Sequence, residues 1–166
     1  MESSARTVDI VITHAASSAD FAAGRALFEE YAGAIDVDLC FQNFAAELER
    51  LPEMYGPPSG CLLLARAGGE LAGSVGVRMR TAAVCEMKRL YVRPTFRGLK
   101  LGRLLADEIA RRASSIGYRT MVLDTLDTMH AALALYHSMG FEPATAYYAN
   151  PLPNVKYLSL DLKRSA

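Results

Sequence analysis

The sequence predicts a mixed α/β domain with one central, mainly antiparallel sheet that is flanked by helices. Strand and helix patterns follow one another irregularly, with three strand patterns in succession near the middle of the chain. That order differs from the strict strand–helix alternation of a doubly wound sheet. The chain has 166 residues, which suits one domain over residues 1–166 with a core that needs no disulfide or metal support.

The N-terminal part is predicted to begin with a strand and a helix. A β-branched run over residues 8–13 predicts the strand. Helical periodicity then continues to about residue 34. Ser17 and Ser18 are candidate N-caps of that helix, and Asp20 lies near its positive end.

A second helix and a hairpin are predicted next. Apolar residues at spacings of three and four predict a helix over residues 39–51, and the Pro- and Gly-rich segment 52–58 is expected to end it in a loop. Two apolar runs, over residues 61–67 and 70–80, are joined by Gly68-Gly69. Two strands linked by a glycine pair are typical of a β-hairpin.

The middle of the chain is predicted to continue with a strand and a long helix. Gly73 and Gly76 interrupt the second hairpin strand and indicate a β-bulge there. Residues 84–92 predict the next strand. Residues 101–116 carry one apolar stripe and predict an amphipathic helix, with Gly117 as its C-cap.

The C-terminal part is predicted to contain a strand, a helix and two closing strands. Alternating apolar residues predict a strand over 119–123. Asp127 is a plausible N-cap for a helix that ends at residues 139–140. Residues 141–146 and 155–160 are predicted to close the sheet.

Charge and targeting signals limit the class of protein. Lys plus Arg equals Asp plus Glu, so the formal net charge is zero, whereas a dedicated nucleic-acid-binding protein is expected to be basic. The first seven residues show no apolar signal region, and no apolar run reaches membrane-spanning length. We therefore expect a cytoplasmic protein with neither nucleic acid nor membrane among its partners.

Cysteine and histidine residues give no metal or disulfide pattern. The cysteine count is odd, no C-x-x-C spacing occurs, and no histidine has a carboxylate or cysteine at a ligand spacing. Reduced thiols and capping or surface histidines are expected, with no metal. The residues concerned are Cys40, Cys61, Cys85, His14, His130 and His137.

The stretch between residues 86 and 102 carries the clearest functional signal. A strand leads through a turn with Pro94 into a Gly-bearing loop, and a helix starts at once. The free N–H groups and the dipole of a helix N-terminus bind phosphate or pyrophosphate. The G-x-G-x-x-G and G-x-x-x-x-G-K-[ST] spacings are absent. Four cations lie nearby: Arg93, Arg97, Lys100 and Arg103.

This loop resembles the acetyl-CoA loop of the GCN5-related N-acetyltransferase (GNAT) family. The family pattern is Arg/Gln-x-x-Gly-x-Gly/Ala, and Arg97 and Gly102 match its first and last positions. Lys100 stands where the family usually has Gly. That lysine either adds a cation near the pyrophosphate or costs a backbone contact, if a positive φ is needed there.

Two further segments resemble the same family. Residues 88–94 look like its fourth strand, and residues 132–141 look like its A-x-x-L-Y-x-x-x-G-F signature. The resemblance covers residues 70–162, and the helical N-terminal part corresponds to the region in which substrate-binding elements usually vary. Met129 stands where other members carry an Asn, so one side-chain contact with the cofactor is expected to be missing.

The resemblance implies the fold, the donor and the residues that bind it. It implies a sheet with two splayed parallel strands, acetyl-CoA as the acyl donor, and a small-molecule or peptide amine as the acceptor. A homodimer is also common in the family. Pantetheine is expected to pair with the backbone of the first splayed strand, and the pyrophosphate with the loop and helix amides. The residues so implicated are Leu90, Tyr91, Val92, Arg97, Gly98, Leu99, Lys100, Leu101, Gly102 and Arg103.

Two side chains are the candidates for proton transfer, which such a reaction needs at the amine and at the leaving thiolate. The family often places an acidic residue where Glu86 stands, as a base that acts directly or through water; a surface carboxylate paired with Lys88 or Arg78 is the alternative. It often uses a Tyr at the position of Tyr136 as the acid; core packing is the alternative. A backbone N–H near Leu90 or Tyr91 is a candidate oxyanion donor.

The acceptor side and the mechanism remain open at the level of sequence. An aromatic loop at residues 147–151 either lines the acceptor pocket or caps the sheet edge, and the loop at 51–58 is a second candidate. Direct attack in a ternary complex is favoured over a covalent intermediate on Cys85, because cysteine is commonly a small buried hydrophobe. A non-catalytic CoA-binding or sensor module is the main alternative, and a nucleotide-binding regulatory domain is a third.

Overall fold

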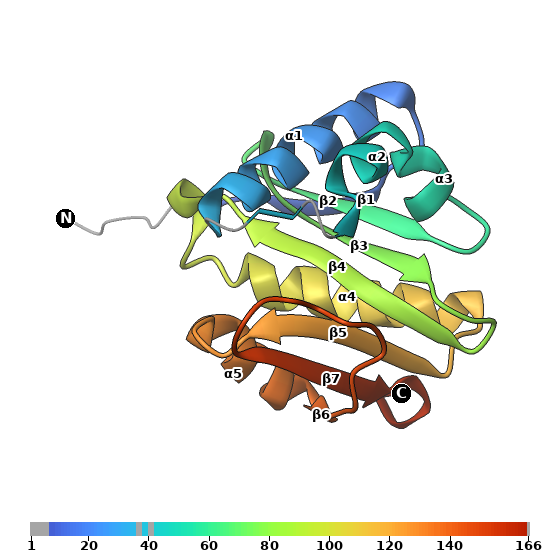
Figure 1. Cartoon of the computed structure of the whole chain (residues 1–166). Coiled ribbons are helices and arrows are strands. Elements are labelled where there is room, and N and C mark those ends of the chain that lie inside the picture. The colour runs from blue at the N-terminus through green and yellow to red at the C-terminus, as the bar shows by residue number, and fades with distance from the viewer. Residues whose placement is uncertain (1–6, 36–37, 40–41, 166) are drawn as a thin grey trace.

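A single seven-stranded sheet with helices on both faces forms the body of the protein (Figure 1). This computed structural model describes residues 7–35, 38–39 and 42–165. The strands lie in the order β1-β2-β3-β4-β5-β7-β6. They are β1 (Ile10–His14), β2 (Cys61–Ala67), β3 (Glu70–Met79), β4 (Val84–Val92), β5 (Thr120–Leu126), β6 (Glu142–Pro143) and β7 (Val155–Asp161). The helices are α1 (Ser18–Ala34), α2 (Phe44–Glu49), α3 (Leu51–Tyr55), α4 (Leu101–Ile116) and α5 (His130–Met139), with 3-10 turns η2 (Pro94–Phe96) and η3 (Leu162–Ser165).

The one parallel pair of the sheet, β4 with β5, opens along its length. Its paired residues run from Val84 opposite Thr120 to Glu86 opposite Val122. Both strands continue beyond that point, β4 to Val92 and β5 to Leu126. The other neighbouring strands are antiparallel. The predicted fold class, a mainly antiparallel mixed sheet with splayed parallel strands and flanking helices, is confirmed.

Both faces of the sheet are covered, which explains the near-continuous apolar run of β2. Leu62 packs in a cluster with residues of α1 and α3, including Phe28. The next residue, Leu63, belongs to the main core with α4 residues such as Leu105. Successive strand side chains point to opposite faces, so a strand buried on both faces has no polar alternation.

Helix ends follow the predicted signals at α1 and α4. Ser17 caps α1 and forms a reciprocal capping box with Asp20. Helix α4 has the predicted bounds, and Gly117 ends it at a φ of 119°, a conformation that costs glycine little.

The single helix predicted over residues 39–51 is wrong, because the segment forms α2 and α3 instead. Pro52 lies in the first turn of α3, where its missing N–H needs no partner, so it begins a helix rather than ending one. Cys40 and Phe41, which belonged to that prediction, lie outside the described residues.

Two C-terminal boundaries also differ from prediction. Helix α5 begins at His130 with Met129 as its N-cap, and the Asp127 N–H instead donates to the Asn154 carbonyl. The strand predicted over 141–146 shrinks to β6, in which Pro143 has no N–H to donate to a partner strand.

Two β-bulges shape the middle of the sheet. The predicted irregularity near Gly73 is confirmed by a register shift between β2 and β3, at Ala65/Arg66. A second shift occurs between Ser74 and Gly76, where the extra residue lies on β4 and Arg89 has a φ of 62°. The second shift lies within the splayed part of β4, beyond its pairing with β5, and a bulge there changes the direction of the neighbouring side chains.

Candidate active site

The start of α4 is an open anion site made of backbone groups. The Leu104 N–H donates to the Lys100 carbonyl at 3.1 Å, so the N–H groups of Leu101, Gly102 and Arg103 precede the first bond of this helix. No side chain caps this end. The helix dipole adds positive potential there. The arrangement suits a phosphate or pyrophosphate, as the motif predicted.

Lys100 adopts the left-handed conformation that the family pattern reserves for glycine. Its φ is 59°, and Gly98, two residues earlier, has a φ of 92°. A non-glycine residue in this region carries strain of about 1 kcal/mol. The loop therefore has a non-glycine residue in a conformation that favours glycine.

Two of the four cations near this loop are engaged within the chain. Arg93 pairs with Glu30 at 2.7 Å, and Arg103 pairs with Asp107 at 2.9 Å. Arg97 and Lys100 are exposed. The sequence predicted all four near the anion site, and Arg97 and Lys100 are the better placed to face a ligand in solution.

A narrow slot of about 60 Å³ lies where β4 and β5 diverge. Tyr136, from α5, is 7% exposed there, and its ring packs edge-on against Phe141 with centroids 5.6 Å apart. Burial raises the pKa of Tyr136 well above its usual value, so the phenol is protonated at neutral pH. Both interpretations of this tyrosine fit, since it belongs to the core and also lines the slot. The slot is lined by Tyr31, Met87, Lys88, Arg89, Leu90, Leu123, Asp124, Thr125, Met129, Ala132 and Tyr136.

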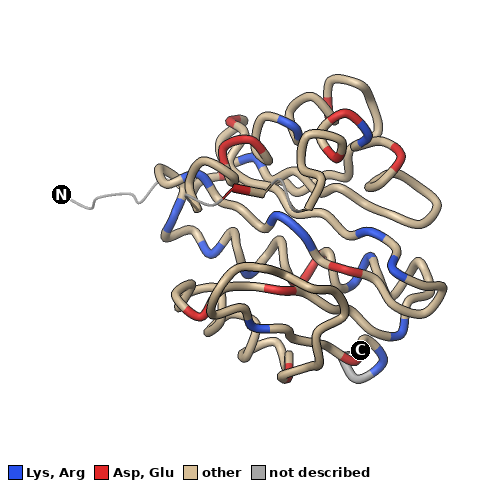
Figure 2. Tube along the Cα trace, in the orientation of Figure 1, with Lys and Arg blue, Asp and Glu red and all other residues tan. Residues whose placement is uncertain are grey.

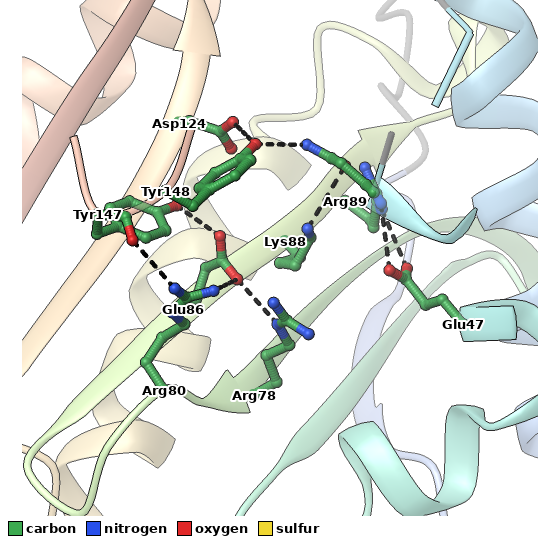
Figure 3. Close-up of polar contacts among 10 residues, drawn as sticks. Glu47, Arg78, Arg80, Glu86, Lys88, Arg89, Asp124, Tyr147 and Tyr148 are labelled. Carbon is green, nitrogen blue, oxygen red and sulfur yellow. Dashed lines mark hydrogen bonds and ion pairs between the residues drawn. The ribbon is translucent and has the colours of Figure 1, made fainter. Parts of the chain in front are cut away.

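A larger cavity of about 360 Å³ adjoins the slot through Lys88, the residue present in both walls. Charged side chains dominate its lining, and Figure 3 shows many of them converging between β4 and the loop before β7. The wall is formed by Gln42, Asn43, Ala46, Glu47, Arg50, Met54, Arg78, Arg80, Glu86, Lys88 and Tyr148. This cavity is the candidate acceptor site.

Glu86 is a buried, fully engaged carboxylate in the wall of this cavity. Its side chain is 1% exposed; Oε1 accepts from Arg78 Nε at 2.8 Å, and Oε2 accepts from the Tyr147 hydroxyl at 2.5 Å (Figure 3). Burial works to raise its pKa, but Lys88, the Tyr147 hydrogen bond and Arg78 outweigh it and hold the pKa below its usual value. The carboxylate is therefore not a surface group, although Arg78 is its partner as the alternative predicted.

A second buried carboxylate fixes α2 to β4. Glu47 and Arg89 are 2% and 3% exposed and form a bidentate pair, Arg89 Nε to Oε2 at 3.1 Å and Nη2 to Oε1 at 3.2 Å. The Arg89 guanidinium also stacks over the rings of Tyr31 and Phe44. Replacing either partner of such a pair lowers the stability of the fold, because the other partner would remain buried and charged.

Hydrogen bonds close the site across segments that are far apart in sequence. The Tyr148 hydroxyl accepts from Gln42 Nε2 at 2.7 Å and donates to Asp124. Asn150 Nδ2 donates to the same carboxylate at 2.8 Å. The segment before α2, strand β5 and the loop before β7 thus meet around one aspartate.

The acceptor-side candidates are only partly brought to the cavity. From the aromatic loop, Tyr148 lines it and Tyr147 holds Glu86. From the loop at 51–58, Met54 lines the cavity, whereas Tyr55 is buried and Glu53 forms an exposed pair with Arg50. The aromatic loop is therefore part of the site and not only a cap on the sheet edge.

Sequence reasoning missed the cationic wall of the cavity, to which Arg80 and Lys88 contribute. One signal could have found it: Arg78, Glu86 and Lys88 interrupt runs that are otherwise apolar, in strands buried on both faces. Charged residues at such positions are rarely buried unless they are paired or functional.

The other titratable candidates do not form a metal site. Within the described residues, no three His, Cys, Asp or Glu side chains gather as metal ligands. Burial raises the pKa of the Cys85 thiol to about 12, and its Sγ lies 3.6 Å from the Thr120 carbonyl.

Of the helices described, none is both long and apolar enough to cross a membrane.

Comparisons with known proteins agree with this geometry. The model of the Acetyltransferase (GNAT) family matches residues 25–141. An uncharacterized N-acetyltransferase of Schizosaccharomyces pombe is 48% identical over 140 residues, which cover 83% of this chain and 86% of that protein. The chain therefore belongs to the GNAT family and is an N-acetyltransferase with an amine acceptor.

Solved structures show the same fold at low sequence identity. A Streptococcus agalactiae acetyltransferase superposes with a TM-score of 0.75 at 18% identity, over 92% of this chain and 98% of that one. Salmonella typhimurium yncA, solved with acetyl-CoA as its cofactor, has a TM-score of 0.66 at 20% identity, over 93% and 94% of the two chains.

Proposed function

We propose that this N-acetyltransferase transfers the acetyl group of acetyl-CoA directly to an amine while both substrates are bound. The observation that carries the proposal is the junction of two cavities at Lys88. Lys88 lines both the slot between β4 and β5 and the charged cavity, so the two cavities are neighbours. An amine in the cavity and a thioester in the slot would therefore face each other, which supplies proximity without a protein-bound intermediate.

The donor is proposed to bind along the backbone of β4 and at the start of α4. Acetyl-CoA supplies an activated acetyl thioester when it is bound. The amides of Leu101, Gly102 and Arg103 receive the pyrophosphate. The end of β4 at Leu90–Val92 lies beyond its pairing with β5, so on that side it offers backbone groups to the pantetheine. An N–H in this part of β4 is proposed to stabilise the oxyanion. Acetyl-CoA in the similarly folded Salmonella protein supports this choice of donor.

Tyr136 is proposed to protonate the leaving thiolate. Its ring lines the slot, and its raised pKa keeps the phenol protonated at neutral pH, so a proton is available beside the leaving thiolate. The core contacts of the ring hold it in position.

Glu86 is proposed to take the proton of the attacking amine, directly or through water. It lies in the cavity wall and is ionised. A lowered pKa makes a weak base, so the competing role is electrostatic, with Glu86 orienting Arg78. Glu86→Gln separates the two: a base role predicts a fall in kcat of about 100-fold at saturating acceptor, and an orienting role predicts mainly a raised KM.

A covalent intermediate on Cys85 is disfavoured. The thiolate is the nucleophilic form, and a pKa of about 12 leaves almost none of it at neutral pH. A Cys85→Ala variant is therefore expected to retain turnover, measured as free thiol release.

The decisive experiment is calorimetric titration with acetyl-CoA, with NADH and ATP as controls, followed by a thiol-release screen of amines. Selective binding of acetyl-CoA with thiol release supports the proposal. Binding without release from any amine would favour the non-catalytic CoA-binding alternative. Preference for a control nucleotide would overturn the donor assignment.

A further inference from the structure

The wall of the cavity beside Glu86 contains more cationic side chains than carboxylates. Its wall contains the cations Arg50, Arg78, Arg80 and Lys88 and the anions Glu47 and Glu86. The positive charge is local, because the chain as a whole has no net charge, and Figure 2 shows Lys and Arg positions on the central strands that border the cavity.

Both carboxylates of the cavity wall already accept hydrogen bonds from side chains of this chain. The two oxygens of Glu47 are held by Arg89, which lies outside this wall. Glu86 is held by Arg78 and by the Tyr147 hydroxyl, with Arg80 at 4.0 Å. Each carboxylate therefore already has an arginine partner, and the charge of Lys88 also helps to hold the pKa of Glu86 below its usual value.

Lys88 is the cation with the least compensation. The residue is 8% exposed, and its Nζ has the neutral Gln42 Oε1 as a hydrogen-bond partner at 3.5 Å, the limit of such a bond. Among the described residues, no carboxylate oxygen lies within 4.0 Å of Nζ. Burial, followed by the charge of Arg89, lowers the pKa of Lys88, and the charges of Glu86 and Glu47 only partly offset this. An anionic group of a ligand within reach of Nζ would stabilise the charged form of this lysine.

We infer that the acceptor is an amine that also carries a carboxylate, of the α-amino-acid type, and that Lys88 and Arg80 bind this carboxylate. The inference rests on the proposed acetyl transfer and names the substrate class. Lys88 stands at the junction of cavity and slot, so a carboxylate held there keeps an amine on the adjacent carbon at the mouth of the slot. The same wall repels polyamines and other acceptors with several positive charges.

Matched ligands test the charge requirement independently of catalysis. N-acetylated glycine, methionine, phenylalanine and glutamate are each compared with the corresponding carboxamide by calorimetry in the presence of CoA. At least one acid is expected to bind tenfold or more tightly than its amide. Equal binding of every acid and amide would overturn the inference.

Two variants test the residues. Lys88→Met keeps the length of the side chain and removes its charge, and Arg80→Gln removes the second cation. Each is expected to raise the Kd of the preferred acid about tenfold or more and to leave the amide unchanged. Arg25→Gln, in an exposed pair on α1, is the control that should change neither. Equal weakening of acid and amide, or no weakening of either, would refute carboxylate binding by these residues.

Turnover assays keep this inference distinct from the proposed function. Preferred binding of acids without thiol release from any amine would support the carboxylate site and contradict acetyl transfer. Thiol release with amines and amino-acid amides as fast as with free amino acids would support acetyl transfer and contradict the carboxylate site.

Discussion

The proposed donor side and the proposed acceptor side of this site are built in different ways. The donor side consists of backbone amides at the start of α4 and a narrow slot between two diverging strands. The acceptor side consists of charged side chains from α2, β3, β4 and the loop before β7, held in ion pairs and hydrogen bonds. A backbone site needs a local conformation, whereas a side-chain site needs distant segments to meet. The first can serve one donor across a family, and the second can change with the acceptor.

The largest effect is expected where the acceptor side is fixed to the sheet. Glu47→Ala leaves the buried Arg89 guanidinium without its partner and should lower the free energy of unfolding by about 3–5 kcal/mol. Urea denaturation measures the change. Glu53→Ala, which removes an exposed pair with Arg50, is the matched control and should cost less than about 1 kcal/mol. Similar small losses in both variants would show that the buried pair does not hold α2 in place.

The donor side is tested next at Tyr136, the proposed acid. Tyr136→Phe should lower kcat about 100-fold and leave the Kd for acetyl-CoA almost unchanged, because the hydroxyl is proposed to act on the leaving thiolate and not on binding. A thiol-release assay measures kcat, and calorimetry measures the Kd for acetyl-CoA. Tyr118→Phe, which removes a hydroxyl that donates to the Ser59 carbonyl, serves as the control. Unchanged turnover in Tyr136→Phe would leave this residue with a packing role alone.

The charge of Glu86 links acceptor-side stability to pH. Because its folded pKa lies below the usual 4.5, the ionised form stabilises the protein above that pH, and this contribution is lost as the pH falls below 4.5 toward the folded pKa. Glu86→Gln should be less stable than the wild type by about 2 kcal/mol at pH 7. The gap, measured by thermal unfolding from pH 7 to pH 3, should shrink as the pH falls. A gap that stays constant over this range would contradict the role of the charge.

A smaller effect is expected at the phosphate approach of the donor side. A Cβ added to Gly102 would meet only Leu135 Cδ2, at 3.9 Å, so alanine fits. Gly102→Leu should weaken acetyl-CoA binding about tenfold, which is about 1.4 kcal/mol, by crowding the amides. Gly102→Ala is the control. If the leucine variant folds and binds acetyl-CoA as tightly as the wild type, the pyrophosphate does not lie there.

The smallest effect concerns the strain at Lys100. Lys100→Gly removes a side chain from a φ of 59° and should stabilise the protein by about 1 kcal/mol. Lys100→Ala, which keeps the Cβ and removes the charge, should leave stability near that of the wild type. Equal melting temperatures for the glycine and alanine variants would show that the loop stores no such strain.

The sequence predicted the parts of the fold that depend on local rules. The bounds of β2, β4 and α4 agree with prediction, because apolar periodicity, the glycine pair and Gly117 act within a few residues. It failed where one residue type permits two local outcomes. Pro52 begins α3 instead of ending a helix, because the first turn of a helix needs no N–H from it, and only Glu142 and Pro143 of the strand predicted over 141–146 belong to β6.

The candidate site also has parts that depend on local motifs and parts that depend on contacts between distant segments. The amides of residues 101–103 and the position of Tyr136 follow from local motifs, so the sequence alone determined the family of this protein and was enough to propose the donor side. The partners of Glu86 lie 8 and 61 residues away, and Gln42 meets Tyr148 across 106 residues. Only the tertiary structure decided which charges are buried, which are paired, and that Lys88 stands between two cavities. Side chains reach such positions because segments far apart in the sequence pack together, and no residue spacing in the sequence indicates which of these segments meet.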